Sequence, residues 1–228
     1  MPKTGASKKT SPVTRNRGRP RSATGLADAT VGRDTLIEAT IELLKSKTPS
    51  AITPVVVARA VGVHPSLIRY YFNNRATLLV AVAERLTSEF TTQVEQATIS
   101  DSSPTNRLKA RIGALIDLNA TYPFFHQLFV SEIAASDDPA AREMVARFTN
   151  RGQGAYGTIM HAGLDDGSFR GVDPGLLYVA IIGMSEFYVS ARRQLEVTHG
   201  SDIDEAEQRS VYKAFVCDLV LDGVRSRD

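Results

Sequence analysis

The chain has 228 residues, of which 43% are hydrophobic and 23% charged, ordinary values for a soluble globular protein. This apolar content is enough for a core that needs neither disulfides nor structural metals. Cys217 is the only cysteine, which excludes an intramolecular disulfide framework and a cysteine-cluster zinc site. The longest apolar run, 176–184, is about half of the ~20 residues that span a bilayer, and no apolar segment follows the basic N-terminus. We therefore expect a cytoplasmic protein without signal peptide, membrane partner, metal or cofactor.

The net charge of +2 is distributed unevenly. Residues 1–33 contain eight basic residues and one acidic residue, a net +7, so the rest of the chain carries −5. A basic arm on an acidic body indicates a polyanionic partner that binds at one end of the molecule. A solvated tail that aids only solubility explains the charge equally well. Residues 1–29 have almost no large apolar side chains, so we expect this arm to be disordered when free.

From about residue 30 the apolar residues follow helical spacing, and no run shows the alternation typical of strands, so the predicted fold is all-α. A first helix is expected to end in a loop at 46–50. Thr53 followed by Pro54 predicts the N-terminus of a short second helix, and Gly62 predicts its end. A third helix is predicted from His64-Pro65 to about residue 72.

Longer helices are predicted beyond this point. One follows the break at 73–74 and carries an apolar residue at every fourth position over 78–94. Others are expected to begin near three prolines, namely Pro104, Pro123 and Pro139. Gly163 and Gly167 mark the next connection.

Residues 53–72 have the pattern of a helix-turn-helix. The small side chain of Ala58 allows two helices to cross closely, and Gly62 allows the tight turn between them. Five apolar side chains are placed to face inward: Val57, Val61, Val63, Ile68 and Phe72. The opposite face of the third helix presents Pro65, Ser66, Arg69 and Tyr70. This helix is about 10–12 Å long, so its N-terminal end fits a DNA major groove.

Over residues 33–80 the chain resembles the tetracycline-repressor-like (TetR) family of bacterial transcriptional regulators. The matching positions are Thr53, Val57-Ala58, Gly62-Val63, Ile68 to Phe72, Arg75 and Leu78-Leu79. The resemblance implies a three-helix DNA-binding domain over 30–76 and a helical domain for effector binding and dimerisation over 77–228. Three residues differ from the family pattern, namely Val61, His64 and Ser66. None breaks the turn, although His64 is either a weaker N-cap than serine or has a second role.

The resemblance also implies which residues contact DNA. Phosphate contacts are expected from Thr53, Tyr70, Tyr71 and Arg75. Arg69 is the candidate for base readout because a guanidinium can bond bidentately to guanine, and a phosphate contact without sequence information is the alternative. The start of the third helix completes this predicted set with His64, Pro65, Ser66 and Leu67.

Arg17 and Arg19 are the candidate DNA contacts of the arm. They lie in the sequence Arg17-Gly18-Arg19-Pro20-Arg21, which resembles the AT-hook core that occupies A·T-rich minor grooves. Five residues in a compositionally biased tail are a weak signal, so a sequence-neutral basic arm is the preferred interpretation.

In this family the C-terminal helices usually surround an inducer pocket. We expect aromatic, Met and His side chains of this region to line it: Phe125, His126, Phe129, Met160, His161, Met184, Phe187 and Tyr188. Ordinary core packing is the alternative for each of them.

The last two predicted helices, 174–195 and about 204–224, have more apolar surface than one chain easily covers. The first is apolar nearly all round, and the second has a stripe formed by Val211, Phe215 and Leu219. Two such pairs make a four-helix bundle, so we expect a homodimer that binds a palindromic operator.

The sequence thus predicts a homodimeric repressor that a small-molecule effector releases from double-stranded DNA. The alternative is a DNA-binding regulator without an effector, whose C-terminal domain serves dimerisation or protein contacts. An enzyme is the weakest hypothesis. Gly152, Gly154 and Gly157 have the spacing of a dinucleotide-binding motif but follow a helical pattern instead of a strand, and no two histidines have metal-binding spacing.

Overall fold

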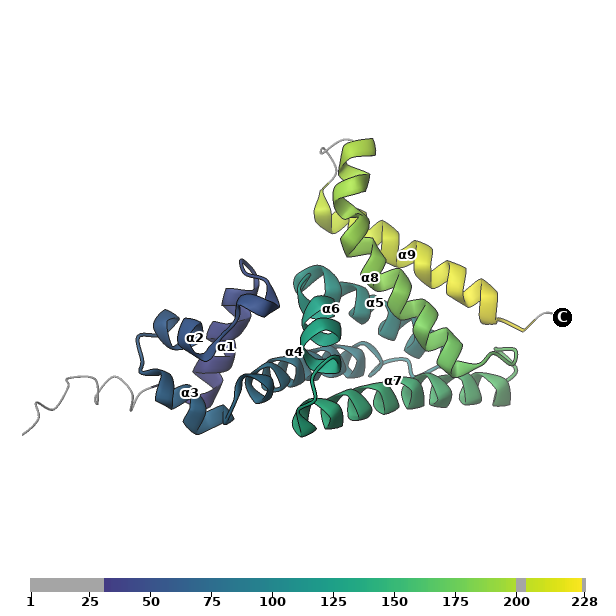
Figure 1. Ribbon diagram of the computed structural model, residues 1–228. Coiled ribbons are helices and arrows are strands. Elements are labelled where there is room, and N and C mark those ends of the chain that lie inside the picture. Colours follow the sequence, from purple (N-terminus) through teal and green to yellow (C-terminus); the bar gives the residue numbers. More distant parts are fainter. Residues whose placement is uncertain (1–30, 200–203, 227–228) are drawn as a thin grey trace, which may run out of the picture.

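The computed structural model describes residues 31–199 and 204–226, which form helices and connections with one isolated bridge between Phe169 and Arg225. The all-α prediction is confirmed. The N-terminal group contains α1 (Arg33–Leu44), the single turn η2 (Pro49–Ala51), α2 (Pro54–Ala60) and α3 (Pro65–Phe72). The body contains α4 (Arg75–Ala97), α5 (Pro104–Thr121), α6 (Phe125–Gln127), the π-helical η3 (Leu128–Ala134), α7 (Pro139–Asp165), α8 (Pro174–His199) and α9 (Glu205–Val224). In Figure 1 the N-terminal group lies at one end of the molecule, with α8 and α9 at the other.

Local sequence signals set the ends of the short helices. The Thr53 hydroxyl accepts the Val56 N–H at 3.3 Å, and Pro54 occupies the first position of α2. Gly62 has a φ of +72°, a conformation that glycine adopts without steric cost, so the chain turns tightly between α2 and α3. The predicted bounds of both helices are confirmed.

The start of α4 is fixed from two sides. The Asn74 side chain accepts the Thr77 N–H at 2.9 Å, and the Thr77 hydroxyl accepts the Asn74 N–H at 3.3 Å, which makes a reciprocal cap. The Asn74 amide also donates to Asp138 Oδ2 at 2.8 Å, and Asp138 itself caps α7. The N-terminus of α4 is therefore bonded both to its own first turn and to the N-terminus of α7.

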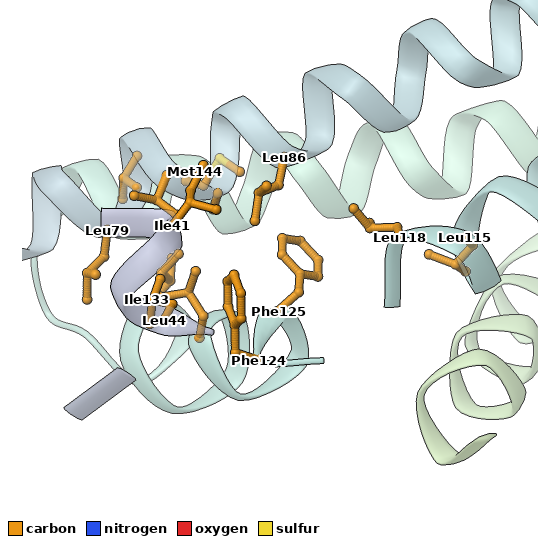
Figure 2. Close-up of a cluster of buried hydrophobic side chains, with 14 of the residues drawn as sticks. Ile41, Leu44, Leu79, Leu86, Leu115, Leu118, Phe124, Phe125, Ile133 and Met144 are labelled. Carbon is orange, nitrogen blue, oxygen red and sulfur yellow. The ribbon is translucent and has the colours of Figure 1, made fainter. Parts of the chain in front are cut away.

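One hydrophobic core runs through the N-terminal group and the body. Figure 2 shows Ile41 and Leu44 of α1 in one hydrophobic cluster with Phe124, Phe125 and Ile133 of the body. The first turns of α4 are buried between these parts, with Leu78, Leu79 and Leu86 inaccessible to solvent. The division that the sequence predicts at 76/77 therefore falls within the first turn of α4, in a helix shared by both parts.

Two details differ from the predicted helix ends. Gly163 lies inside α7, where a Cβ atom would come within 2.1 Å of the Phe169 ring, so it allows a close approach and marks no connection. Gly167, with a φ of +76°, is the residue at which the chain turns. Helix α8 also continues to His199 instead of ending near residue 195.

Candidate DNA-binding surface and ligand cavity

Helix α3 has a buried face and an exposed polar face. Ile68 and Phe72 are buried, whereas Arg69 is exposed and the Tyr70 side chain is 79% exposed. Among the described residues, no carboxylate lies within ion-pairing distance of Arg69. Its guanidinium is thus available for an anionic or hydrogen-bonding partner outside the protein.

His64 is the N-cap of α3. Its Nδ1 atom accepts the Ser66 N–H at 3.2 Å and lies 2.8 Å from the Ser66 hydroxyl. Two of the three residues that depart from the family pattern, His64 and Ser66, therefore bond to each other. The expected weakness of a histidine cap is offset because the side chain of Ser66 adds a second contact.

The other predicted contacts at this end differ in exposure. Thr53 is exposed at the start of α2, and since its oxygen accepts the helix N–H, its hydroxyl hydrogen remains able to donate to a phosphate. Pro65, Leu67 and Tyr71 are half-buried, and the last two pack against the core. The Tyr70 and Tyr71 rings meet edge to face with centroids 5.1 Å apart. The side chains of Thr53 and Tyr70 are therefore open to solvent, whereas those of Leu67 and Tyr71 are partly covered by the core.

Arg75, for which the family resemblance implies a phosphate contact, is bonded to partners within the protein. Its Nε donates to the Ile52 carbonyl at 2.6 Å and one Nη to the Pro49 carbonyl at 2.7 Å. Its other Nη pairs with Glu132 Oε2 at 2.7 Å. Three partners within the protein occupy this guanidinium, so Arg75 joins η2 to η3 of the body, and its predicted phosphate contact stays a prediction.

We expect Arg75→Ala to lower the free energy of unfolding by about 2–4 kcal/mol, because it leaves two carbonyls and a half-buried Glu132 carboxylate without their partner. Urea unfolding at a fixed protein concentration measures this change. Arg59→Ala, at an exposed residue of α2, is the control and should change stability by less than about 0.5 kcal/mol. If Arg75→Ala leaves stability unchanged and weakens DNA binding, Arg75 is a phosphate contact after all.

Arg17 and Arg19 lie outside the described residues. The predicted DNA contacts that the structure describes therefore lie at the start of α2, in the turn before α3, on α3 and at the start of α4.

The body contains a cavity of about 540 Å³ between α4, α5, α7 and α8. Such a volume lies within the range of about 300–1,000 Å³ that is usual for small-molecule sites. Its lining combines eight aromatic or aliphatic residues with five charged and four hydroxyl side chains and one glycine: Glu84, Thr87, Ser88, Phe90, Thr91, Thr92, Glu95, Arg111, Leu115, Leu118, Met144, Arg147, Phe148, Arg151, Gly152, Tyr156, Tyr178 and Ile182.

None of the eight residues predicted to line a pocket lies on this cavity. Phe125 and Phe129 pack behind it, with their rings 6.3 and 4.7 Å from that of Phe148, which does line it. His126 pairs with Glu186 at 2.8 Å.

The other five predicted residues face elsewhere. Met160 is buried in the core, and exposed His161 lies 3.7 Å from Asp165. On α8, where Tyr178 and Ile182 face the cavity, three residues point in other directions: Met184, Phe187 and Tyr188. The sequence predicts a pocket among the C-terminal helices. Which residues line it depends on which faces of α7 and α8 pack toward α4, and the composition of these helices does not specify those faces.

Arg111 is the basic side chain of the cavity that packs against aromatic rings. Its guanidinium carbon lies 5.3 Å from the centre of the Phe90 ring and 5.1 Å from that of Tyr156. Burial raises the pKa of Tyr156 to about 12, against smaller opposing effects of the Arg111 cation and of a side-chain hydrogen bond from Arg111. Burial also raises the pKa of Tyr178. Both phenols therefore remain neutral at physiological pH.

A second exposed feature is an apolar surface on α8 and α9. Seven large apolar side chains there are more than half exposed: Leu176, Val179, Phe187, Val197, Val211, Phe215 and Leu219. The segment 174–191 of α8 is long and apolar enough to cross a membrane by length and composition, and 28% of it is buried. Helices of soluble proteins pass this test too, so it is weak evidence for a membrane span. The described part of the chain contains no group of three or more His, Cys, Asp or Glu residues that could hold a metal ion.

The comparison with protein-family models identifies one family. Residues 101–228, more than half of the chain, match the model of the tetracyclin repressor-like C-terminal domain. A search of curated proteins returned no match.

Solved structures show the same fold at low sequence identity. The ketosteroid transcriptional regulator KstR2 of Mycobacterium tuberculosis is similar over 87% of this chain and 97% of its own, with a TM-score of 0.64 and 16% identity. A TetR-family regulatory protein from Rhodococcus RHA1 is similar over 90% and 100%, with a TM-score of 0.66 and 20% identity. AibR, solved with isovaleryl coenzyme A and operator DNA, is similar over 69% and 85%, with a TM-score of 0.58 and 18% identity. The chain belongs to the TetR-like family of DNA-binding transcriptional regulators.

Proposed function

We propose that the protein is a cytoplasmic, homodimeric repressor that binds a palindromic operator and is released from it by a small molecule. The observation that carries the DNA-binding part is the exposed polar face of α3, where Arg69 is available and Tyr70 is 79% exposed. It fits the insertion of a recognition helix into a major groove. Membership in a family of regulators favours this role over an enzymatic one.

The cavity favours an effector over the alternative of an effector-independent regulator. Helix α4 lines it over residues 84–95, and the first residue of the same helix, Arg75, binds η2 next to the DNA-binding helices. A displacement of α4 would therefore move the recognition helix. The ligand must bind the DNA-incompetent arrangement more tightly, because equal affinity for both arrangements shifts nothing.

Thermal denaturation with a small-molecule library tests this part of the proposal, since a ligand that binds only the folded state raises the melting temperature. Each stabilising compound is then added to the complex of protein and operator. A stabilising compound that lowers operator affinity supports effector release. Compounds that stabilise the protein and leave operator affinity unchanged would favour the effector-independent alternative.

Arg69→Ala should relax the base preference at one position of each half-site, with a loss of about 1–3 kcal/mol for each bidentate contact. Tyr70→Phe is the matched comparison, because it removes one hydroxyl from the predicted phosphate contact and should weaken all DNA sequences alike by about 0.5–1.5 kcal/mol. Binding titrations against a set of single-base operator variants distinguish the two patterns. A uniform loss in Arg69→Ala would identify Arg69 as another phosphate contact.

A further inference from the structure

We infer that the cavity between α4, α5, α7 and α8 binds an amphipathic organic carboxylate, with Arg111 pairing its carboxylate and the aromatic walls covering its apolar body. This inference rests on the proposed function, because it names the chemical class of the effector.

The first observation is a cation without a counter-ion. The Nε atom of Arg111 is buried and has no hydrogen-bond partner, and among the side chains that the structure describes no carboxylate lies within ion-pairing distance of the guanidinium. Removing a charged group from water is costly unless it is paired, and the faces of Phe90 and Tyr156 offset only part of this cost. A ligand carboxylate would supply the missing partner through charge-assisted hydrogen bonds.

The neighbouring side chains do not neutralise this charge. Tyr156 and Tyr178 are phenols whose raised pKa values keep them protonated, so they offer O–H donors to an anion instead of a negative charge. Glu84 is already paired with Arg147. Glu95, on the exposed side of α4, has no ion pair with Arg111.

Arg151 is a further cation on the lining, and it too has no ion pair within the described parts of the chain. Arg111 and Arg151 thus have no ion pair, whereas Glu95 is the one lining carboxylate without one, so the lining has an excess of positive charge. Arg151 and Glu95 are both exposed, and Arg111 is the least accessible of the three. The lining should therefore prefer anions to neutral or cationic molecules of the same shape.

The walls indicate that the anion carries an apolar body. Besides the two tyrosines, six lining residues are aromatic or aliphatic: Phe90, Leu115, Leu118, Met144, Phe148 and Ile182. Gly152 lets the Tyr178 ring lie directly on α7, because a Cβ at this position would come within 2.5 Å of that ring. Inorganic anions would leave most of this surface uncovered, whereas an acyl chain or a ring system buries it.

Matched acids and amides test the inference on the full-length protein. The probes are decanoate with decanamide and 4-phenylbutyrate with 4-phenylbutyramide, and isothermal titration calorimetry gives their dissociation constants. At least one acid should bind wild-type protein about 10- to 100-fold more tightly than its amide, the difference expected for a charge-assisted hydrogen bond. Arg111→Gln should remove this preference, and Arg111→Lys should restore part of it.

Lys109→Gln is the control, because it removes one positive charge from an exposed site of α5 that does not line the cavity. It should keep the preference for the acid. The inference is overturned if neither acid binds wild-type protein, if the amides bind equally well, or if Arg111→Gln binds the acids as wild type does. The acid-to-amide comparison on wild-type protein needs no variant, so poor folding of Arg111→Gln does not prevent this decision.

Operator release is measured separately with the same probes. An acid that binds through Arg111 and leaves operator affinity unchanged supports the carboxylate site and contradicts the proposed effector release. A neutral compound that releases the operator when the acids do not bind contradicts the carboxylate site and supports the effector release.

Discussion

Phe215→Glu combined with Leu219→Glu is expected to make the protein monomeric and to lower its operator affinity at least about 100-fold. Both side chains are more than half exposed on α9, in the stripe that also contains Val211. Together with the exposed apolar residues of α8 they form an apolar surface, which the proposed two-fold partner would cover. In a dimer, binding of one subunit to its half-site holds the second subunit close to the other half-site. A monomer binds one half-site only and loses this gain in affinity.

Analytical ultracentrifugation at micromolar concentration measures the oligomeric state, and gel-shift titration measures operator affinity. Ile99→Glu is the control, since Ile99 is 82% exposed outside α8 and α9 and its replacement should leave the dimer intact. A wild-type protein that sediments as a monomer would refute the proposed interface. Flotation of wild-type protein with lipid vesicles would instead assign the apolar surface of α8 to a membrane.

Removing residues 1–28 should flatten the dependence of log affinity on log salt by roughly 5, because about three of the seven basic residues of each arm would otherwise neutralise phosphates in the dimer complex. Between 50 and 200 mM salt, the full chain should therefore lose about 1,000-fold more affinity than the truncated chain. Folding and dimerisation should be unaffected, because the arm has almost no apolar side chains to bury.

Replacing the seven Lys and Arg residues of the arm by Gln is the matched variant, since it keeps the length of the chain and removes only the charge. Its salt dependence should equal that of the truncated protein. If Arg17 and Arg19 read an A·T-rich minor groove, both variants should also lose a preference for A·T-rich flanks. An unchanged salt dependence would identify the arm as a solvated tail.

The DNA-binding helices could be predicted closely because their signals are local. Thr53 caps α2, Gly62 permits the turn and Asn74 caps α4, and each acts within a few residues of its own position. The exposed face of α3 follows from the 3.6-residue period once Ile68 and Phe72 are buried.

Arg75 and the cavity could not be predicted in this way, because their partners are distant in the sequence. Arg75 bonds to Pro49, Ile52 and Glu132, up to 57 residues away, so a local motif could not distinguish a structural contact from a phosphate contact. Phe90 belongs to the apolar row that predicted α4, and only the packing of four helices turns it toward Arg111. Helical periodicity predicts which face of a helix is buried, but not whether the residues of that face fill the core or line a cavity.

Selection of DNA by the full-length protein from a random pool tests the central claim most directly. The account predicts that the selected fragments share an inverted repeat, with half-sites about one helical turn apart or a small multiple of it. Arg69→Ala should select the same repeat with one position of each half-site relaxed. Recovery of fragments without a common sequence, by a folded and dimeric protein, would contradict sequence-specific recognition through α3.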